Sequence, residues 1–146
     1  MTENEITLRI RQLMKKLDQY KDQRKKQEAK YEQLEQAKRA YLNAQDRFRQ
    51  MQIQRKAVLM KYRTENESSR FFKTYFSEME SMTDGTECNR VTRDIDHAIV
   101  VLDDQKKQTY RQINSLEEQS LRAKTEIERL RCELKAMQAK AMEEQL

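Results

Sequence analysis

The sequence predicts an all-α protein, organised as one long antiparallel helical hairpin with coiled-coil packing. The first observation behind this prediction is that the 146 residues include no proline and a single glycine, Gly85. Folds with many turns normally need several of both residues. The second is that Ala, Glu, Lys, Leu and Arg make up nearly half of the chain, a composition typical of long helices. Sheet-based folds are therefore excluded.

The third observation is a heptad repeat. Stepping by seven from the first isoleucine, eight of eleven positions are apolar or aromatic. The positions are Ile6, Leu13, Tyr20, Gln27, Leu34, Tyr41, Phe48, Arg55, Tyr62, Ser69 and Phe76. A companion stripe lies four residues later at Ile10 and Leu17, and three residues later further on, at Met51 and Val58. A second repeat runs from Ile95 to Met137. Two amphipathic helices are expected.

The element boundaries follow from turn and capping residues. We predict a helix over residues 3–82, a turn at 83–86 and a second helix over 87–145, forming one elongated domain, 1–146. Gly85 is expected to end the first helix in a left-handed conformation, and Thr86 to cap the second. Polar residues at Thr64–Ser69 compete for backbone hydrogen bonds, so the first helix is also predicted to kink there.

Folding about Gly85 predicts which residues face each other. Their numbers should add to roughly 170, so residues 1–23 would extend about 35 Å beyond the second helix. This extension carries the regular apolar stripe Ile6, Ile10, Leu13, Leu17 and Tyr20. A partner helix is expected to cover it, either from another protein or from a second copy of the chain.

An aromatic cluster is the second predicted partner-binding segment. Phe71, Phe72, Tyr75 and Phe76 fall within six residues and cover more than one face of a helix. Such a cluster indicates that a further helix packs against it.

Several functional classes lack the residues they need. The only histidine is His97, and one glycine cannot form a phosphate-binding loop, so we expect no catalytic, cofactor or metal site. The longest apolar run, Ala98–Leu102, is too short to cross a membrane. Cys88 and Cys132 are expected on one helix about 66 Å apart, which excludes a disulfide between them. Without a signal sequence, we expect a cytoplasmic protein.

Charge differs between the two parts of the chain. Residues 1–63 contain 17 basic and 8 acidic residues, whereas residues 64–146 contain 13 basic and 17 acidic. One interpretation is a nucleic-acid-binding arm over Arg9–Arg39. Interspersed acids such as Asp18, Asp22 and Glu28 favour the other, in which basic and acidic parts attract each other across the hairpin.

The step Arg70-Phe71-Phe72, between a long helix and a second amphipathic helix rich in Gln, Glu and Leu, resembles a known family. Residues 40–135 are similar to small helical accessory proteins encoded beside LXG-type toxins of bacterial type VII secretion systems. The resemblance implies a targeting factor that packs along the helical domain of a toxin and is exported with it.

The sequence thus predicts a non-enzymatic helical interaction protein, such as a secretion accessory factor or chaperone, with no cofactor and no membrane insertion. Two alternatives stay open. The length, charge and paired helices also resemble the coiled-coil stalk proteins of flagellar and type III export ATPases. The other alternative is the basic nucleic-acid-binding arm.

Overall fold

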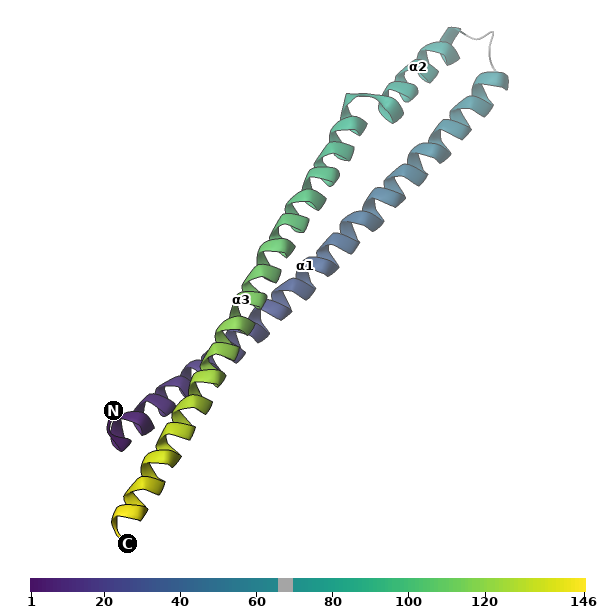
Figure 1. Ribbon diagram of the computed structural model, residues 1–146. Coiled ribbons are helices and arrows are strands. Elements are labelled where there is room, and N and C mark those ends of the chain that lie inside the picture. Colours follow the sequence, from purple (N-terminus) through teal and green to yellow (C-terminus); the bar gives the residue numbers. More distant parts are fainter. Residues whose placement is uncertain (66–69) are drawn as a thin grey trace. The chain divides into compact units, whose positions relative to one another are not determined.

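The computed structural model describes residues 1–65 and 70–146, and the side chains of Thr64, Glu65, Phe72, Thr83 and Asp84 lie outside the description. Three helices follow one another: α1 (Glu3–Glu65), α2 (Arg70–Asp84) and α3 (Thr86–Glu144) (Figure 1). Among the described residues there is no strand. The predicted all-α hairpin class is confirmed.

Helix α1 begins with a reciprocal capping interaction. The backbone N–H of Glu5 donates to the hydroxyl oxygen of Thr2 over 3.2 Å, and the backbone N–H of Thr2 donates to the Glu5 carboxylate over 3.2 Å. Two of the backbone donors that a helix start leaves unsatisfied are thereby used. The helix start is therefore fixed two residues into the chain.

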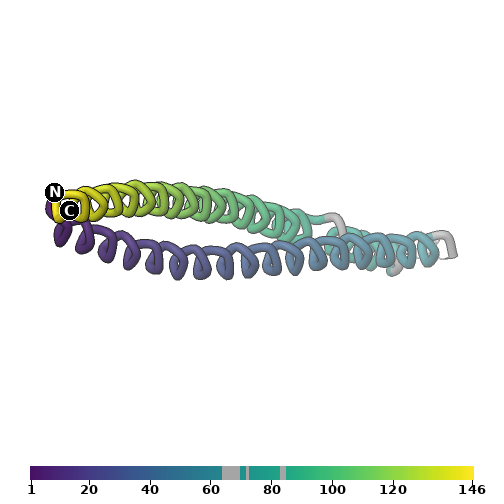
Figure 2. Tube along the Cα trace, turned by 60° about the horizontal axis from the view of Figure 1, so that its bottom comes forward, coloured from purple at the N-terminus to yellow at the C-terminus, as the bar shows by residue number. Residues whose placement is uncertain are grey.

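The chain forms two compact units, each built from antiparallel helical segments. Unit 1 comprises residues Met1–Glu32 and Lys107–Leu146, which bring together the start of α1 and the end of α3. Both chain ends lie at the same end of this unit (Figure 2). Unit 2 comprises residues Gln33–Lys106, which include the rest of α1, all of α2 and the start of α3.

The predicted reversal of the chain at 83–86 is wrong, because it gives a different pairing of the helices from the one observed. Contacts across the helices join residues whose numbers add to 141, rather than to the expected 170. In unit 1 these are Arg24 with Glu117 and Tyr31 with Tyr110, and in unit 2 Glu35 with Lys106, Lys38 with Asp103, and Gln45 with Asp96. Helix α2 also packs against α1. The guanidinium carbon of Arg63 lies 5.2 Å from the ring centroid of Phe76. The kink predicted at Thr64–Ser69 falls on residues 66–69, which lie outside the described residues.

Gly85 separates α2 from α3 by a different device from the one predicted. Its φ is not positive, so the expected left-handed helix end is absent. A Cβ atom at this position would instead meet the backbone carbonyl oxygen of Ser81 at less than van der Waals distance. The carbonyl of Gly85 already accepts a hydrogen bond from the Asn89 N–H over 3.2 Å, so Gly85, rather than Thr86, precedes the first turn of α3. Helical structure therefore resumes at once, and the glycine serves a close backbone approach.

The core of unit 1 contains the apolar stripe that was expected to overhang. Ile6, Ile10 and Leu13 of α1 are buried together with residues of α3: Ala123, Ile127 and Leu130. Leu17 and Tyr20 pack, partly buried, against this cluster. The predicted extension of residues 1–23 is thus wrong, because the observed register places α3 along them. The geometric reason for assigning these five residues to partner binding is lost with it.

Candidate partner-binding groove

The predicted aromatic cluster is split between the interior and the surface of unit 2. Phe76 is 8% exposed and lies under the guanidinium of Arg63, in the geometry of a cation–π contact. Phe71 is 84% exposed and Tyr75 is 46% exposed. Phe72 lies among the residues whose side chains are outside the description. Two of the four predicted binding residues, Phe71 and Tyr75, are therefore at the surface.

These two aromatic residues line an apolar groove between the end of α1 and α2. Its volume is about 710 Å³. The lining residues are Gln54, Arg55, Val58, Leu59 and Tyr62 from α1, with Phe71, Tyr75 and Met79 from α2. The size is within the range of ligand-binding clefts, about 300–1,000 Å³. Because Leu59 is buried and Val58 remains 51% exposed, the groove has an apolar floor and an accessible wall.

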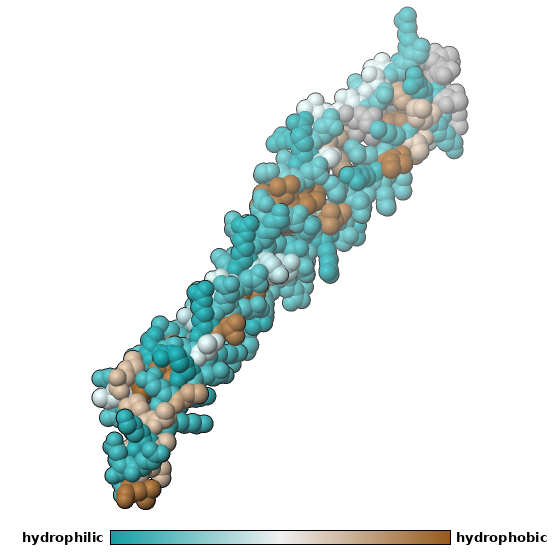
Figure 3. Space-filling view, in the orientation of Figure 1, coloured by the Kyte–Doolittle hydropathy of each residue, from teal (hydrophilic) through white to brown (hydrophobic). Residues whose placement is uncertain are grey.

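An exposed apolar stripe on α1 continues the groove along the helix. Met51 is 48% exposed and precedes Val58 by seven residues, so both lie on one face of α1. Tyr62, four residues after Val58, is 50% exposed on the same face. The face of the molecule drawn in Figure 3 is mostly hydrophilic, with separate apolar patches. Exposed apolar residues beside a groove are typical of interaction sites.

Sequence reasoning missed the α1 side of this groove, because the heptad repeat predicted that these positions face another helix of the chain. Met51 and Val58 belong to its companion stripe, and Arg55 and Tyr62 are heptad positions, yet all four are exposed. The seam itself, at Gln45, Phe48, Gln52 and Leu59, is the face that unit 2 buries or half-buries. The groove therefore needed the correct register before it could be recognised.

Two of the basic residues of α1 that were considered for a nucleic-acid arm form ion pairs with acidic residues of α3. Arg24 Nη2 lies 3.2 Å from Glu117 Oε1 in unit 1, and Lys38 Nζ lies 2.7 Å from Asp103 Oδ1 in unit 2. Each such exposed pair is worth at most about 1 kcal/mol. Their positions nevertheless match attraction across the hairpin, the second of the two interpretations of the charge asymmetry.

A polar gap interrupts the seam of unit 1 where the heptad repeat carries Gln27. A recess of about 480 Å³ is lined by Gln23, Lys26, Gln27, Gln112, Ser115, Leu116 and Gln119. The side-chain oxygen of Gln27 is buried, and no described group donates a hydrogen bond to it. A buried acceptor left in this way lowers stability. The gap separates the apolar core of unit 1 from the Tyr31–Tyr110 contact, whose ring centroids are 6.5 Å apart.

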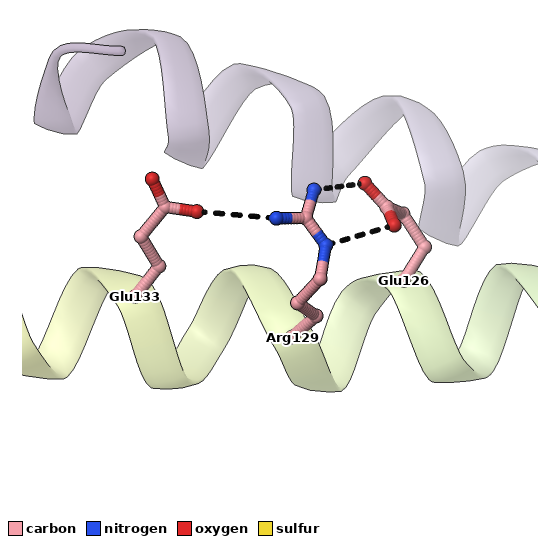
Figure 4. Close-up of polar contacts among 3 residues, drawn as sticks. All are labelled: Glu126, Arg129 and Glu133. Atoms are coloured by element: carbon pink, nitrogen blue, oxygen red, sulfur yellow. Dashed lines mark hydrogen bonds and ion pairs between the residues drawn. The ribbon is translucent and has the colours of Figure 1, made fainter.

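Two residues with shifted pKa values, Glu126 and Arg129, lie on the surface of α3 (Figure 4). The guanidinium of Arg129 donates to both carboxylate oxygens of Glu126 over 2.7 and 3.1 Å, and lies 3.5 Å from Glu133 Oε2. These hydrogen bonds lower the pKa of the Glu126 carboxyl and raise the pKa of Arg129. The three residues are neighbours on one helix, so the cluster supports α3 locally.

No group of three or more His, Cys, Asp or Glu side chains among the described residues could hold a metal ion. Both cysteines lie on α3 as free thiols, with Cys88 half-buried and Cys132 exposed. Within residues 1–65 and 70–146, no helix is long and apolar enough to cross a membrane.

Comparison of the chain with protein-family models, with curated proteins and with solved structures finds no match.

Proposed function

We propose that the protein is a non-enzymatic interaction protein whose groove between α1 and α2 binds a helix of a partner protein. The observation that carries this proposal is the exposure of Phe71, 84%, at the edge of an apolar groove of about 710 Å³. An amphipathic helix that lays its apolar stripe into such a groove would cover Phe71, Val58 and Tyr62 together. Aromatic residues in a central pocket are typical binding hot spots.

The chemical character of the groove favours binding over catalysis. Among its described lining residues, the polar ones are Gln54, Arg55 and the two tyrosines, and none is a carboxylate, histidine or cysteine. General acid–base or nucleophilic catalysis needs a base positioned beside the reacting group. The groove can thus exclude water and hold apolar side chains, which is what a docking site requires.

For the identity of the partner, the support is the sequence resemblance alone. It suggests that the bound helix belongs to the helical domain of an LXG-type toxin, and that the protein serves as a secretion accessory factor. The exposed Phe71 lies within the Arg70-Phe71-Phe72 step that carries this resemblance. Co-expression with such a toxin domain, followed by size-exclusion chromatography, tests this finer assignment: separate elution of the two proteins would refute it.

The test of the general proposal is site-specific photo-crosslinking in the source cells. A photoreactive phenylalanine analogue replaces Phe71 in the groove, and replaces Leu121, which is 66% exposed on α3 in unit 1, as a matched control. We expect the Phe71 position to yield one discrete adduct with another protein, and the Leu121 position to yield no such adduct. Equal adducts at both positions, or an adduct that nuclease digestion removes, would refute a protein-docking groove.

A further inference from the structure

The two sides of the groove carry opposite charges. On α1, the segment Arg47–Arg63 contains six basic residues and no acidic one. Three of them, Arg47, Arg55 and Lys61, lie three or four residues from Met51 or Val58. Residues at this spacing share a face of a helix, so these cations flank the exposed apolar stripe. All three are exposed.

The α2 side differs. Glu78 follows Phe71 by seven residues and Tyr75 by three, so it lies on the face of α2 that carries these two groove residues. Glu78 is exposed. The groove therefore has a cationic α1 side and an anionic position on its α2 side.

We propose that the groove selects a partner helix that is amphipathic and carries acidic residues along the flank that faces α1. This inference rests on the proposed function, and it adds the charge and the orientation of the bound helix. An apolar stripe of the partner fills the space above Leu59, between Val58 and Phe71. Carboxylates on one flank lie near Arg47, Arg55 and Lys61, and the flank towards Glu78 is neutral or basic. Charge patterns of this kind set the register and the direction of helix pairing.

A protein helix fits this pattern better than a nucleic acid does. Single-stranded nucleic acids bind along grooves that are basic throughout, with aromatic platforms for the bases. Here the aromatic residues are accompanied by Val58, Leu59 and Met79, which provide a floor for aliphatic side chains. Glu78 would also oppose a phosphate backbone on the α2 side. One-sided basic charge with an apolar floor matches a single amphipathic helix.

The test uses the full chain and two fluorescein-labelled synthetic helical peptides. Both peptides carry the same leucine and phenylalanine stripe; one has glutamates along one flank, and the other has lysines at the same positions. Binding is followed by fluorescence anisotropy at low and at high salt. We expect the glutamate peptide to bind at least about five-fold more tightly, because three exposed ion pairs each contribute a fraction of a tenfold change. The preference should narrow as salt screens the charges.

Two variants separate the charge inference from the groove itself. The triple variant Arg47→Glu, Arg55→Glu, Lys61→Glu should reverse the preference between the peptides. Phe71→Ser should weaken the binding of both peptides, whereas the matched surface variant Leu121→Ser should change the binding of neither. Circular dichroism establishes that each variant keeps its helicity.

The outcomes distinguish the charge inference from the groove as a docking site. Equal binding of the two peptides that is lost in Phe71→Ser would overturn the charge inference and leave the groove as a docking site. Binding that Phe71→Ser does not change, or no binding of either peptide, would overturn both. Sedimentation equilibrium of the chain alone identifies a second copy as the occupant if a dimer forms and Phe71→Ser dissociates it, which would also overturn the inference. The inference would also be overturned if a single-stranded oligonucleotide displaced the peptide from the chain, and if this displacement required Arg47, Arg55 and Lys61.

Discussion

The register of unit 1 can be tested by replacing Ile6 with alanine. Ile6 is 0% exposed and belongs to a buried cluster with Ile127 and Leu130 of α3. Truncating a fully buried isoleucine to alanine removes the transfer free energy of three carbon atoms and leaves a cavity, at a cost of about 2–5 kcal/mol. The lower part of this range is expected, about 2–3 kcal/mol, because a two-helix seam can close around a cavity more easily than a deep core can.

The alternative register predicts the opposite sign. If residues 1–23 extended beyond α3, Ile6 would touch solvent, and alanine, the better helix former, would leave stability unchanged or slightly raise it. Leu8 supplies the matched control, since it lies on the same turn of α1 and is 57% exposed. Leu8→Ala should change the free energy of unfolding by less than about 0.5 kcal/mol.

The assay must report on unit 1, because local opening can differ between units. Urea unfolding followed by circular dichroism gives the global free energy. Hydrogen–deuterium exchange of peptides from residues 1–32 and 107–146 gives the local value. We expect Ile6→Ala to accelerate exchange in both segments. Equal exchange in Ile6→Ala, Leu8→Ala and the parent protein would refute the observed register and restore the extended arm.

Three further predictions address single positions. Gln27→Leu should raise the free energy of unfolding by about 1 kcal/mol, because it removes a buried oxygen that no described group satisfies; unchanged urea unfolding would show that the gap already solvates it. Gly85→Ala and Gly85→Asn should lower the melting temperature alike, by the equivalent of about 1–3 kcal/mol, since any Cβ meets the Ser81 carbonyl; rescue by asparagine alone would indicate a left-handed glycine after all. The hydrogen bonds from Arg129 lower the pKa of the Glu126 carboxyl in the folded protein from its usual value of about 4.5. The stability that this interaction gives the folded protein is therefore fully present above the unfolded pKa, and it is lost as pH falls through the folded pKa. Glu126→Gln should therefore flatten the pH dependence of stability below about pH 4.5, and identical acid-unfolding profiles would contradict it.

The fold class could be predicted from the sequence because helix formation here is encoded locally. Absence of proline, a single glycine and a sustained seven-residue repeat leave few alternatives to paired helices. The heptad seam at Ile6 and Leu13 was identified correctly, and both are buried. Pairing between helices depends on contacts between residues far apart in the sequence, and no local pattern encodes these.

The position of the reversal shows this difference between local and long-range information. Gly85 is a strong local signal for a helix end, and a helix does end there, yet α3 begins one residue later. The observed pairing instead places α3 along the start of α1, where Ile6 and Ile10 are buried against it. Local propensities indicate where a helix is interrupted, and burial summed over the seam selects the interruption at which the chain turns back.

The candidate binding site differs from the predicted one for the same reason, namely that the predicted pairing of the helices was wrong. When a proposed register leaves an apolar stripe exposed, the first conclusion should be that the register is wrong. Burying Ile6 and Ile10 within the chain stabilises the fold without the loss of translational and rotational freedom that binding a partner requires. The residues that are exposed in the observed register cannot be explained by a wrong register in this way. Met51, Val58 and Phe71 stay at the surface although the residues of the seam are already buried, and the proposed docking site is placed there for this reason.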